Sequence, residues 1–199
     1  MAWRRLRRWQ EEGVWTRIWQ AFLSSLDEQS KLLWSRAFLD GSFFQRKKGG
    51  EEVGLTEVGK GTKRMLVVDG NGVPLAPSIS RAEVKLAQET LERVRVPRRR
   101  GRPRKRPERL VADKAYDCDR FRGWLRRKGV IPCIPPRRNR RGRRKRWEDE
   151  YRKRWRVERT FAWLGNFRRL VVRWERLAMM YEAFCILACI IICLGKLLK

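Results

Sequence analysis

Histidine is absent from the 199 residues of the chain, and this absence excludes a large part of enzyme chemistry. Without an imidazole there is no histidine-assisted nucleophile, no histidine-ligated zinc and no imidazole acting as general base. Any catalysis must therefore depend on carboxylates, lysine, tyrosine or cysteine.

Paired cysteines are also lacking. The chain has five cysteines, no C-x-x-C pair, and a start at Met1 without an apolar leader. Cys185, Cys189 and Cys193 recur every four residues, which predicts one face of a helix whose small thiols pack in the core. An odd number of cysteines without a leader favours the reducing cytoplasm.

Long apolar runs are scarce. The most apolar segment, from Ala183 to Leu194, has twelve residues, whereas about 20 are needed to cross a bilayer. We therefore expect a buried helix at this point and no membrane partner.

Acidic residues are few relative to basic ones. There are 22 Asp and Glu against 50 Lys and Arg, which gives a net charge of +28. Because 42% of the residues are hydrophobic, the chain can still bury a core. Such an excess of positive charge favours a polyanionic partner, and nucleic acid is the obvious one. A ribosomal-type RNA binder and a merely basic globule are the alternatives.

The apolar periodicity and the turn residues predict an alternation of strands and helices. The predicted elements are helices within 1–30, a strand over 36–44, a hairpin over 64–80, a helix over 81–94, a strand ending at Asp113, a helix through Phe121–Leu125, a strand over 130–136, and helices over 148–167 and from 179 to the end. Residues 47–63, 97–109 and 137–146 are expected to be loops. This order predicts an α/β fold with a mixed sheet, since the hairpin is antiparallel and the later strands need helical crossovers.

Three carboxylates from distant positions can converge in such a sheet. Asp40 lies on the first strand, Asp113 ends a later strand, and Glu158 lies on a late helix one turn after Arg154. Their oxygens would suit Mg²⁺ or Mn²⁺, and two such ions could support phosphodiester chemistry. Each residue also has a local alternative: Asp40 could cap a turn, Asp113 could cap the following helix, and Glu158 could pair with Arg154.

Several ordered motifs carry a resemblance to a known family. Tyr151, Arg154 and Glu158 fit the first three terms of a Y-x2-R-x3-E-x6-K signature, whose lysine position is Gly165, with Arg168 and Arg169 nearby. Together with "LDGSFF", "KGTKRMLVVDGNGVPL" and "LVADKAYD", they resemble the DDE transposases of bacterial insertion sequences, in the group of insertion sequences four and five.

The resemblance implies a ribonuclease H-like domain over residues 31–199, preceded by a helical segment over 1–30 that resembles the tail of a longer DNA-binding region. It implies that Asp40, Asp113 and Glu158 are the catalytic, metal-binding triad for Mg²⁺ or Mn²⁺. The implied activity is cleavage and transfer of DNA strands at the ends of the element. A ribonuclease H-like nuclease without strand transfer and an inactive DNA-binding remnant are the alternatives.

Basic residues are expected to contact the DNA. "RGRPRKRP", from Arg100 to Pro107, resembles the core of an AT-hook, an extended segment that lies in a narrow minor groove; phosphate contact alone is the alternative. The expected DNA-binding residues are Tyr151, Arg154, Arg100, Arg102, Arg104, Lys105, Arg143 and Arg144. Expected partners are double-stranded DNA at element ends and target, with a homodimer and a separately encoded N-terminal segment as further candidates. A nucleoid-associated location in the cytoplasm follows from these expectations.

Overall fold

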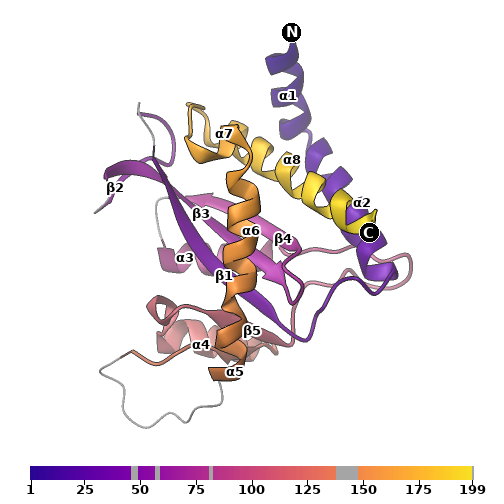
Figure 1. Ribbon diagram of the computed structural model, residues 1–199, viewed down its shortest axis with the longest axis vertical. Helices are drawn as coiled ribbons and strands as arrows, with labels where there is room; N and C mark the ends of the chain where they lie inside the picture. The colour runs from indigo at the N-terminus through magenta and orange to yellow at the C-terminus, as the bar shows by residue number, and fades with distance from the viewer. Residues whose placement is uncertain (46–48, 57–58, 81–82, 138–147, 199) are drawn as a thin grey trace.

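The computed structural model describes residues 1–45, 49–56, 59–80, 83–137 and 148–198 (Figure 1). In chain order the elements are α1 (Ala2–Glu11), α2 (Val14–Glu28), β1 (Ala37–Gln45), β2 (Gly54–Thr56), β3 (Gly59–Asp69), β4 (Pro74–Ser80), α3 (Glu83–Glu92), β5 (Arg109–Ala112), the 3₁₀ turn η1 (Lys114–Tyr116), α4 (Asp119–Arg127), β6 (Ile131–Cys133), α5 (Glu148–Tyr151), the 3₁₀ turn η2 (Arg152–Arg154), α6 (Trp155–Gly165), α7 (Arg168–Val171) and α8 (Ala178–Leu197).

The strands form one mixed sheet in the order β2-β3-β1-β5-β6, and β4 also pairs with β3. The β1–β3 and β3–β4 pairs are antiparallel, whereas β5 and β6 extend the sheet parallel to β1. This topology confirms the predicted α/β class and is consistent with a ribonuclease H-like fold preceded by helices. The short strand β2 and the first residues of β3 lie within the segment predicted to be a loop, so that expectation was wrong at 54–56 and 59–63.

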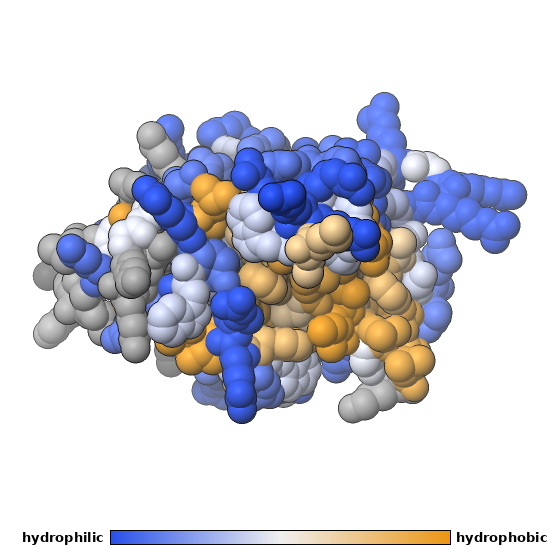
Figure 2. All heavy atoms as spheres, turned by 90° about the horizontal axis from the view of Figure 1, so that it is seen from above, coloured by the Kyte–Doolittle hydropathy of each residue, from blue (hydrophilic) through white to orange (hydrophobic). Residues whose placement is uncertain are grey.

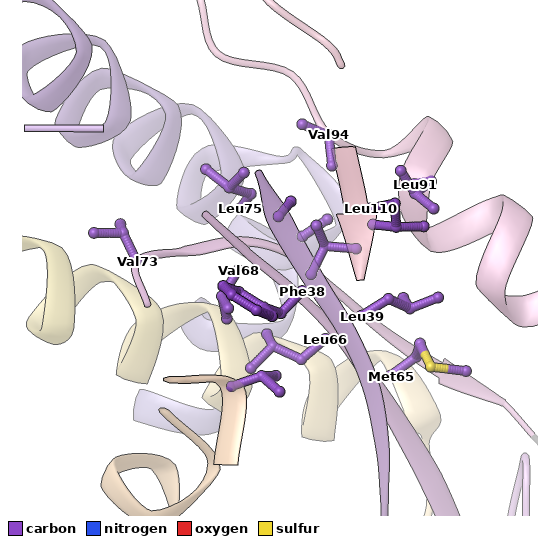
Figure 3. Close-up of a cluster of buried hydrophobic side chains, with 14 of the residues drawn as sticks. Phe38, Leu39, Met65, Leu66, Val68, Val73, Leu75, Leu91, Val94 and Leu110 are labelled. Atoms are coloured by element: carbon purple, nitrogen blue, oxygen red, sulfur yellow. The ribbon is translucent and has the colours of Figure 1, made fainter. Parts of the chain in front are cut away.

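The hydrophobic core is centred on β1, β3 and β5. Phe38, Leu66 and Leu110 are fully buried in neighbouring strands, and Figure 3 shows such side chains gathered around β1. These strands have continuous apolar runs because a central strand that is covered on both faces needs apolar residues at every position. Helix α6 crosses β1 and contacts β3 as well (Figure 1).

The two N-terminal helices differ in how they are buried. Helix α1 has no buried residue and projects from the body of the protein (Figure 1), whereas α2 packs along α8. The buried residues of α2 are Trp19, Leu23 and Leu26. Ile18, on the same helix, is 38% exposed.

Helix α8 is longer than its most apolar segment suggested. Cys185, Cys189 and Cys193 are fully buried, as the spacing predicted, and all five cysteines are free. The helix has 20 residues and is long and apolar enough to cross a membrane, so the argument from a length of twelve residues was wrong. One such helix is weak support for a membrane span, because core helices have the same length and composition, and 44% of its most apolar window is buried.

The end of the molecule from which α1 projects carries an exposed apolar area bordered by hydrophilic side chains (Figure 2). On α8, Ile191 and Leu194 are the large apolar residues that remain exposed among those described. Helix α8 therefore has one apolar face in the core and a second that reaches solvent.

The turn between β3 and β4 is built around the buried carboxylate of Asp69. Its oxygens accept hydrogen bonds from the backbone N–H groups of Leu33 (2.7 Å), Asn71 (2.9 Å) and Val73 (2.7 Å). At the end of the turn Gly72 has a φ of 81°, in the left-handed region that favours glycine. The turn therefore depends on both Asp69 and Gly72. Through its bond with Leu33, Asp69 also holds the segment before β1.

We expect the stability of the protein to depend on the protonation of Asp69. Burial raises the pKa of this carboxyl to about 6, although the three N–H donors favour its charged form. A pKa that is higher in the folded state than in the unfolded chain means that protonation favours folding. The contribution is therefore present at low pH and is lost as the pH rises through 6.

Urea unfolding of the wild type and of Asp69→Asn tests this expectation. Between pH 7 and pH 5 the difference in unfolding free energy between the two proteins should grow by about 1.4 kcal/mol, the value of one pKa unit. The variant should be less stable at every pH, because asparagine has one acceptor oxygen for three donors. A difference that is constant with pH would contradict the expectation.

Candidate active site

The strand register places Asp40 and Asp113 beside each other. Strands β1 and β5 run parallel, and Leu39 pairs with Ala112. The next residue in each chain segment is an aspartate, and β5 ends at this point. The two carboxylates therefore come from adjacent strands at the same level of the sheet.

The third carboxylate comes from the helical segment that crosses β1. Residues 148–167 were predicted to be one helix, but the 3₁₀ turn η2 separates α5 from α6, and α6 ends at Gly165. In a 3₁₀ turn, side chains three residues apart lie directly over one another. The turn therefore brings Tyr151 and Arg154 to the same side, and Glu158 follows one helical turn later.

The turn after β3 fixes the position of α6. The hydroxyl of Thr160 donates to the carbonyl oxygen of Gly72 at 2.7 Å, and Arg159 donates to the carbonyl of Asn71 at 3.0 Å. A Cβ at Gly72 would lie 3.2 Å from the Thr160 hydroxyl oxygen. The helix that carries Glu158 thus docks on the backbone of the turn, at a position where a side chain would crowd it.

All three carboxylates surround one guanidinium group. Arg154 Nη2 lies 2.7 Å from an oxygen of Asp40, and Nη1 lies 3.3 Å from Asp113 and 3.6 Å from Glu158. The hydroxyl of Tyr151 lies 3.3 Å from the same Asp113 oxygen. The structure thus brings together Asp40, Asp113, Glu158, Tyr151 and Arg154.

Burial and charge act in opposite directions at this cluster. Burial raises the pKa of Asp40 above its ordinary value, and the charge of Arg154 opposes this rise without cancelling it. Burial lowers the pKa of Arg154, but Asp40 and its other acidic neighbours outweigh this effect and leave the pKa raised. Arg154 is therefore a permanent cation among the carboxylates. Glu158 is the most exposed of the three, with 58% of its side chain accessible.

The local roles that the sequence left open are present as well. Asp40 accepts a hydrogen bond from the N–H of Gly41 at 2.9 Å, and Asp113 caps η1 by accepting from Ala115 at 3.0 Å. The pair of Glu158 with Arg154 is the longest of the three ion pairs around that arginine. Local capping alone does not explain why three residues distant in sequence share one cation.

The three carboxylates supply hard oxygen donors, the ligands that Mg²⁺ and Mn²⁺ prefer. In the part of the chain that the structure describes, no three acidic or cysteine side chains lie close enough together to hold a metal ion. The centre of the carboxylate cluster contains the guanidinium of Arg154 instead. The carboxylate oxygens are chemically suited to a hard cation, but the positive charge of Arg154 already occupies the centre of the cluster.

Two residues beside the cluster were missed by the sequence analysis. Lys63 has its pKa lowered by burial, and the charge of Asp40 opposes that change. Burial, followed by the charges of Asp40 and Asp113, raises the pKa of Tyr116. Lys63 lies within the motif "KGTKRMLVVDGNGVPL" and Tyr116 within "LVADKAYD", three residues after Asp113, but neither was singled out as a site residue.

Gly165 stands at the lysine position of the signature, and the space around it is unfilled by described residues. Gly165 is the last residue of α6, and a Cβ built there meets no atom within 4 Å. Of the two nearby arginines, Arg169 lies 3.5 Å from Glu175 and over the ring of Phe184. Arg168 is exposed.

The predicted basic residues have different surroundings. Residues 97–103 form a projecting loop, here called the basic finger, which is closed by backbone hydrogen bonds between Val96 and Arg104. Arg100 and Arg102 are exposed in the finger, and Lys105 is exposed just after it. Arg143 and Arg144 lie outside the described residues.

Arg104 differs from the exposed Arg100, Arg102 and Lys105 in that it points at the protein. Its guanidinium lies 3.8 Å from Asp27 and 4.8 Å from the centre of the Trp34 ring. Gly101 has a φ of 86°, so the finger turns at its tip. The extended conformation expected from the AT-hook resemblance is therefore wrong for this structure, because the two ends of the finger are held together at its base.

Comparison with known proteins agrees with this geometry. Residues 35–193 match the family described as "Transposase DDE domain". A protein of Burkholderia cepacia named "Putative transposase for insertion sequence element IS402" is 40% identical over 141 residues, which are 69% of this chain and 64% of that protein. The chain thus spans less than two thirds of that relative.

A second protein of the same organism, named "Insertion element IS402 uncharacterized 16.2 kDa protein", is 39% identical over 55 residues, which are 28% of this chain and 37% of that protein. The family match covers most of the chain and contains Asp40, Asp113 and Glu158. The chain therefore belongs to the DDE transposase family of insertion sequences.

Proposed function

We propose that this transposase binds double-stranded DNA at the ends of an insertion element, and that it cuts and rejoins strands with Mg²⁺ or Mn²⁺ held by Asp40, Asp113 and Glu158. One observation carries the proposal: carboxylates from β1, from the residue that follows β5 and from α6 converge on a single cation. When bound, the metal ions would activate the attacking oxygen and stabilise the leaving oxygen.

Neighbouring residues of the chain would position the carboxylates and the DNA phosphate. The hydrogen bond from Tyr151 orients Asp113, and the docking of Thr160 on Gly72 sets the height of Glu158 above the sheet. Arg154 supplies a positive charge that can pair with a DNA phosphate, whose oxygens match the fork of a guanidinium. None of these roles requires a histidine side chain.

The basic finger is the proposed phosphate-binding element. Arg100 and Arg102 are exposed, and Arg98 and Arg104 brace the base of the finger against Asp27. With a net charge of +28, the chain has a large excess of cations for DNA. We also propose a homodimer. A separately encoded N-terminal segment is a further proposed partner, because this chain matches two proteins of one element in part.

The test uses a plasmid that carries the DNA flanking the coding sequence on both sides, in which inverted repeats are expected at the ends of the element. With Mg²⁺ or Mn²⁺ we expect strand cleavage at the repeat ends and joining of those ends to target DNA. Chelation of the metal should abolish both reactions, and renewed addition of Mg²⁺ should restore them. Cleavage without joining would favour the nuclease alternative, and cleavage that persists in excess chelator would contradict the proposed metal dependence.

A further inference from the structure

We propose that Arg154 is the built-in counter-ion of the carboxylate cluster, so that divalent metal ions and the Arg154 guanidinium compete for Asp40, Asp113 and Glu158. The inference rests on the proposed metal site. It adds that this site is closed by the protein's own cation until the guanidinium moves.

The distances show how completely the guanidinium occupies the cluster. It lies within 3.6 Å of an oxygen from each of the three carboxylates, and the shortest contact is 2.7 Å, to Asp40. A metal ion would be bound by these same carboxylates. The guanidinium and the metal therefore cannot both hold their full set of contacts.

The charges favour the metal ion in this competition. Three carboxylates share the guanidinium of Arg154, and Lys63 on β3 is a further cation whose charge interacts with Asp40. A divalent cation compensates twice the charge of a guanidinium and accepts the hard oxygen donors directly. Because arginine stays protonated in proteins, Arg154 must move out of the cluster when a metal ion enters.

The present contacts of Arg154 are also incomplete. Its Nε is buried and has no hydrogen-bond partner among the described residues. The side chain retains 20% of its accessible surface, so it has a route to solvent or to a DNA phosphate. Arg154 ends the 3₁₀ turn η2, and such turns inside helices often mark a hinge.

Binding of Mn²⁺ to the purified full chain, measured by isothermal titration without DNA, tests the inference. We expect Arg154→Gln to bind Mn²⁺ more tightly than the wild type by about 5- to 150-fold, the range that coupled sites commonly show. Arg154→Lys, which keeps the charge, should bind Mn²⁺ less tightly than Arg154→Gln.

Arg152→Gln is the matched control, because it removes the same charge from an exposed position in the same turn. Its Mn²⁺ affinity should change by less than about twofold, since exposed charges are screened. Asp113→Asn should abolish binding in either background. Thermal melts of all variants would show that each is folded.

The outcomes separate this inference from the proposed function. If the wild type and Arg154→Gln bind Mn²⁺ equally at a site that Asp113→Asn removes, the metal site stands and the competition is wrong. An equal gain in Arg152→Gln would reduce the effect to net charge and would overturn the inference too. If neither protein binds Mn²⁺, the proposed metal site fails, and the competition fails with it.

Discussion

Replacement of Asp40 or Asp113 by asparagine is expected to lower DNA cleavage on the order of 10³-fold or more while the protein stays folded. A bound divalent cation supplies several kcal/mol of stabilisation to the transition state, and each 1.36 kcal/mol is tenfold in rate. An amide is a neutral and weaker ligand than a carboxylate. Loss of one carboxylate should therefore remove most of that stabilisation.

The fold should survive these changes for a reason visible in the structure. The hydrogen bonds that Asp40 accepts from Gly41 and that Asp113 accepts from Ala115 need only a side-chain oxygen, which asparagine keeps. The measurement is cleavage of a labelled duplex that contains an element end, with thermal melts alongside. Asp149→Asn, an exposed acid on α5, is the control and should cleave normally. Cleavage by Asp113→Asn within about threefold of the wild type would remove Asp113 from the proposed triad.

The second large effect concerns DNA affinity, which should fall by roughly 10³–10⁵ between 50 and 200 mM salt. A fall of this size corresponds to about 6–10 phosphate contacts, since each contact releases condensed counterions from the DNA. Fluorescence anisotropy of a labelled duplex over a salt series gives the slope. An affinity that is flat across this range would contradict the electrostatic account of binding.

The basic finger can be tested within the same series. In the double variant Arg100→Gln, Arg102→Gln the negative slope of log affinity against log salt should become shallower, by about 0.9 for each phosphate that the finger no longer binds. The matched control removes Arg7 and Arg8 of α1, which pair with Glu11 and Glu12. That double variant has the same charge as the finger variant and should keep the wild-type slope. Equal slopes for both variants would place the phosphate-binding residues outside the finger.

The central strands were predictable from the sequence because each contains an uninterrupted run of apolar residues. The run from Ala37 to Leu39 and the run from Leu110 to Ala112 each end at a polar residue, and both strands were placed correctly. Strand β2 was not predictable, since its three residues are held by backbone pairing with Gly59–Gly61 at the sheet edge. Pairing through the backbone does not require a particular pattern of side chains, so the sequence of β2 carries no strand signal.

The helices show a different limit of prediction. The continuous polar and apolar pattern from Glu148 to Gly165 does not distinguish an α-helix from one interrupted by a 3₁₀ turn, so η2 was missed. Trp155, the first residue of α6, is 49% exposed. The interruption changes which residues face the sheet, and this change cannot be obtained from the sequence period alone.

The candidate site was predictable in its members but not in its contacts. The signature selected Tyr151, Arg154 and Glu158, and its helical spacing suggested that Arg154 pairs with Glu158. The structure gives Arg154 its shortest contact with Asp40, on a strand 114 positions earlier in the chain. The approach of α6 to β1 depends on the docking of Thr160 on Gly72, and sequence spacing contains no information about that docking.

The most direct test of the account locates the metal ion on the chain itself. Fe²⁺ in place of Mg²⁺, with ascorbate and peroxide, generates hydroxyl radicals that cut the backbone next to the bound ion. The account predicts cuts near residues 40, 113 and 158 that excess Mg²⁺ suppresses, that Asp113→Asn abolishes and that Arg154→Gln strengthens. Cuts elsewhere in the chain, or cuts near these residues that survive in Asp113→Asn, would contradict the assignment of the three carboxylates as the metal site.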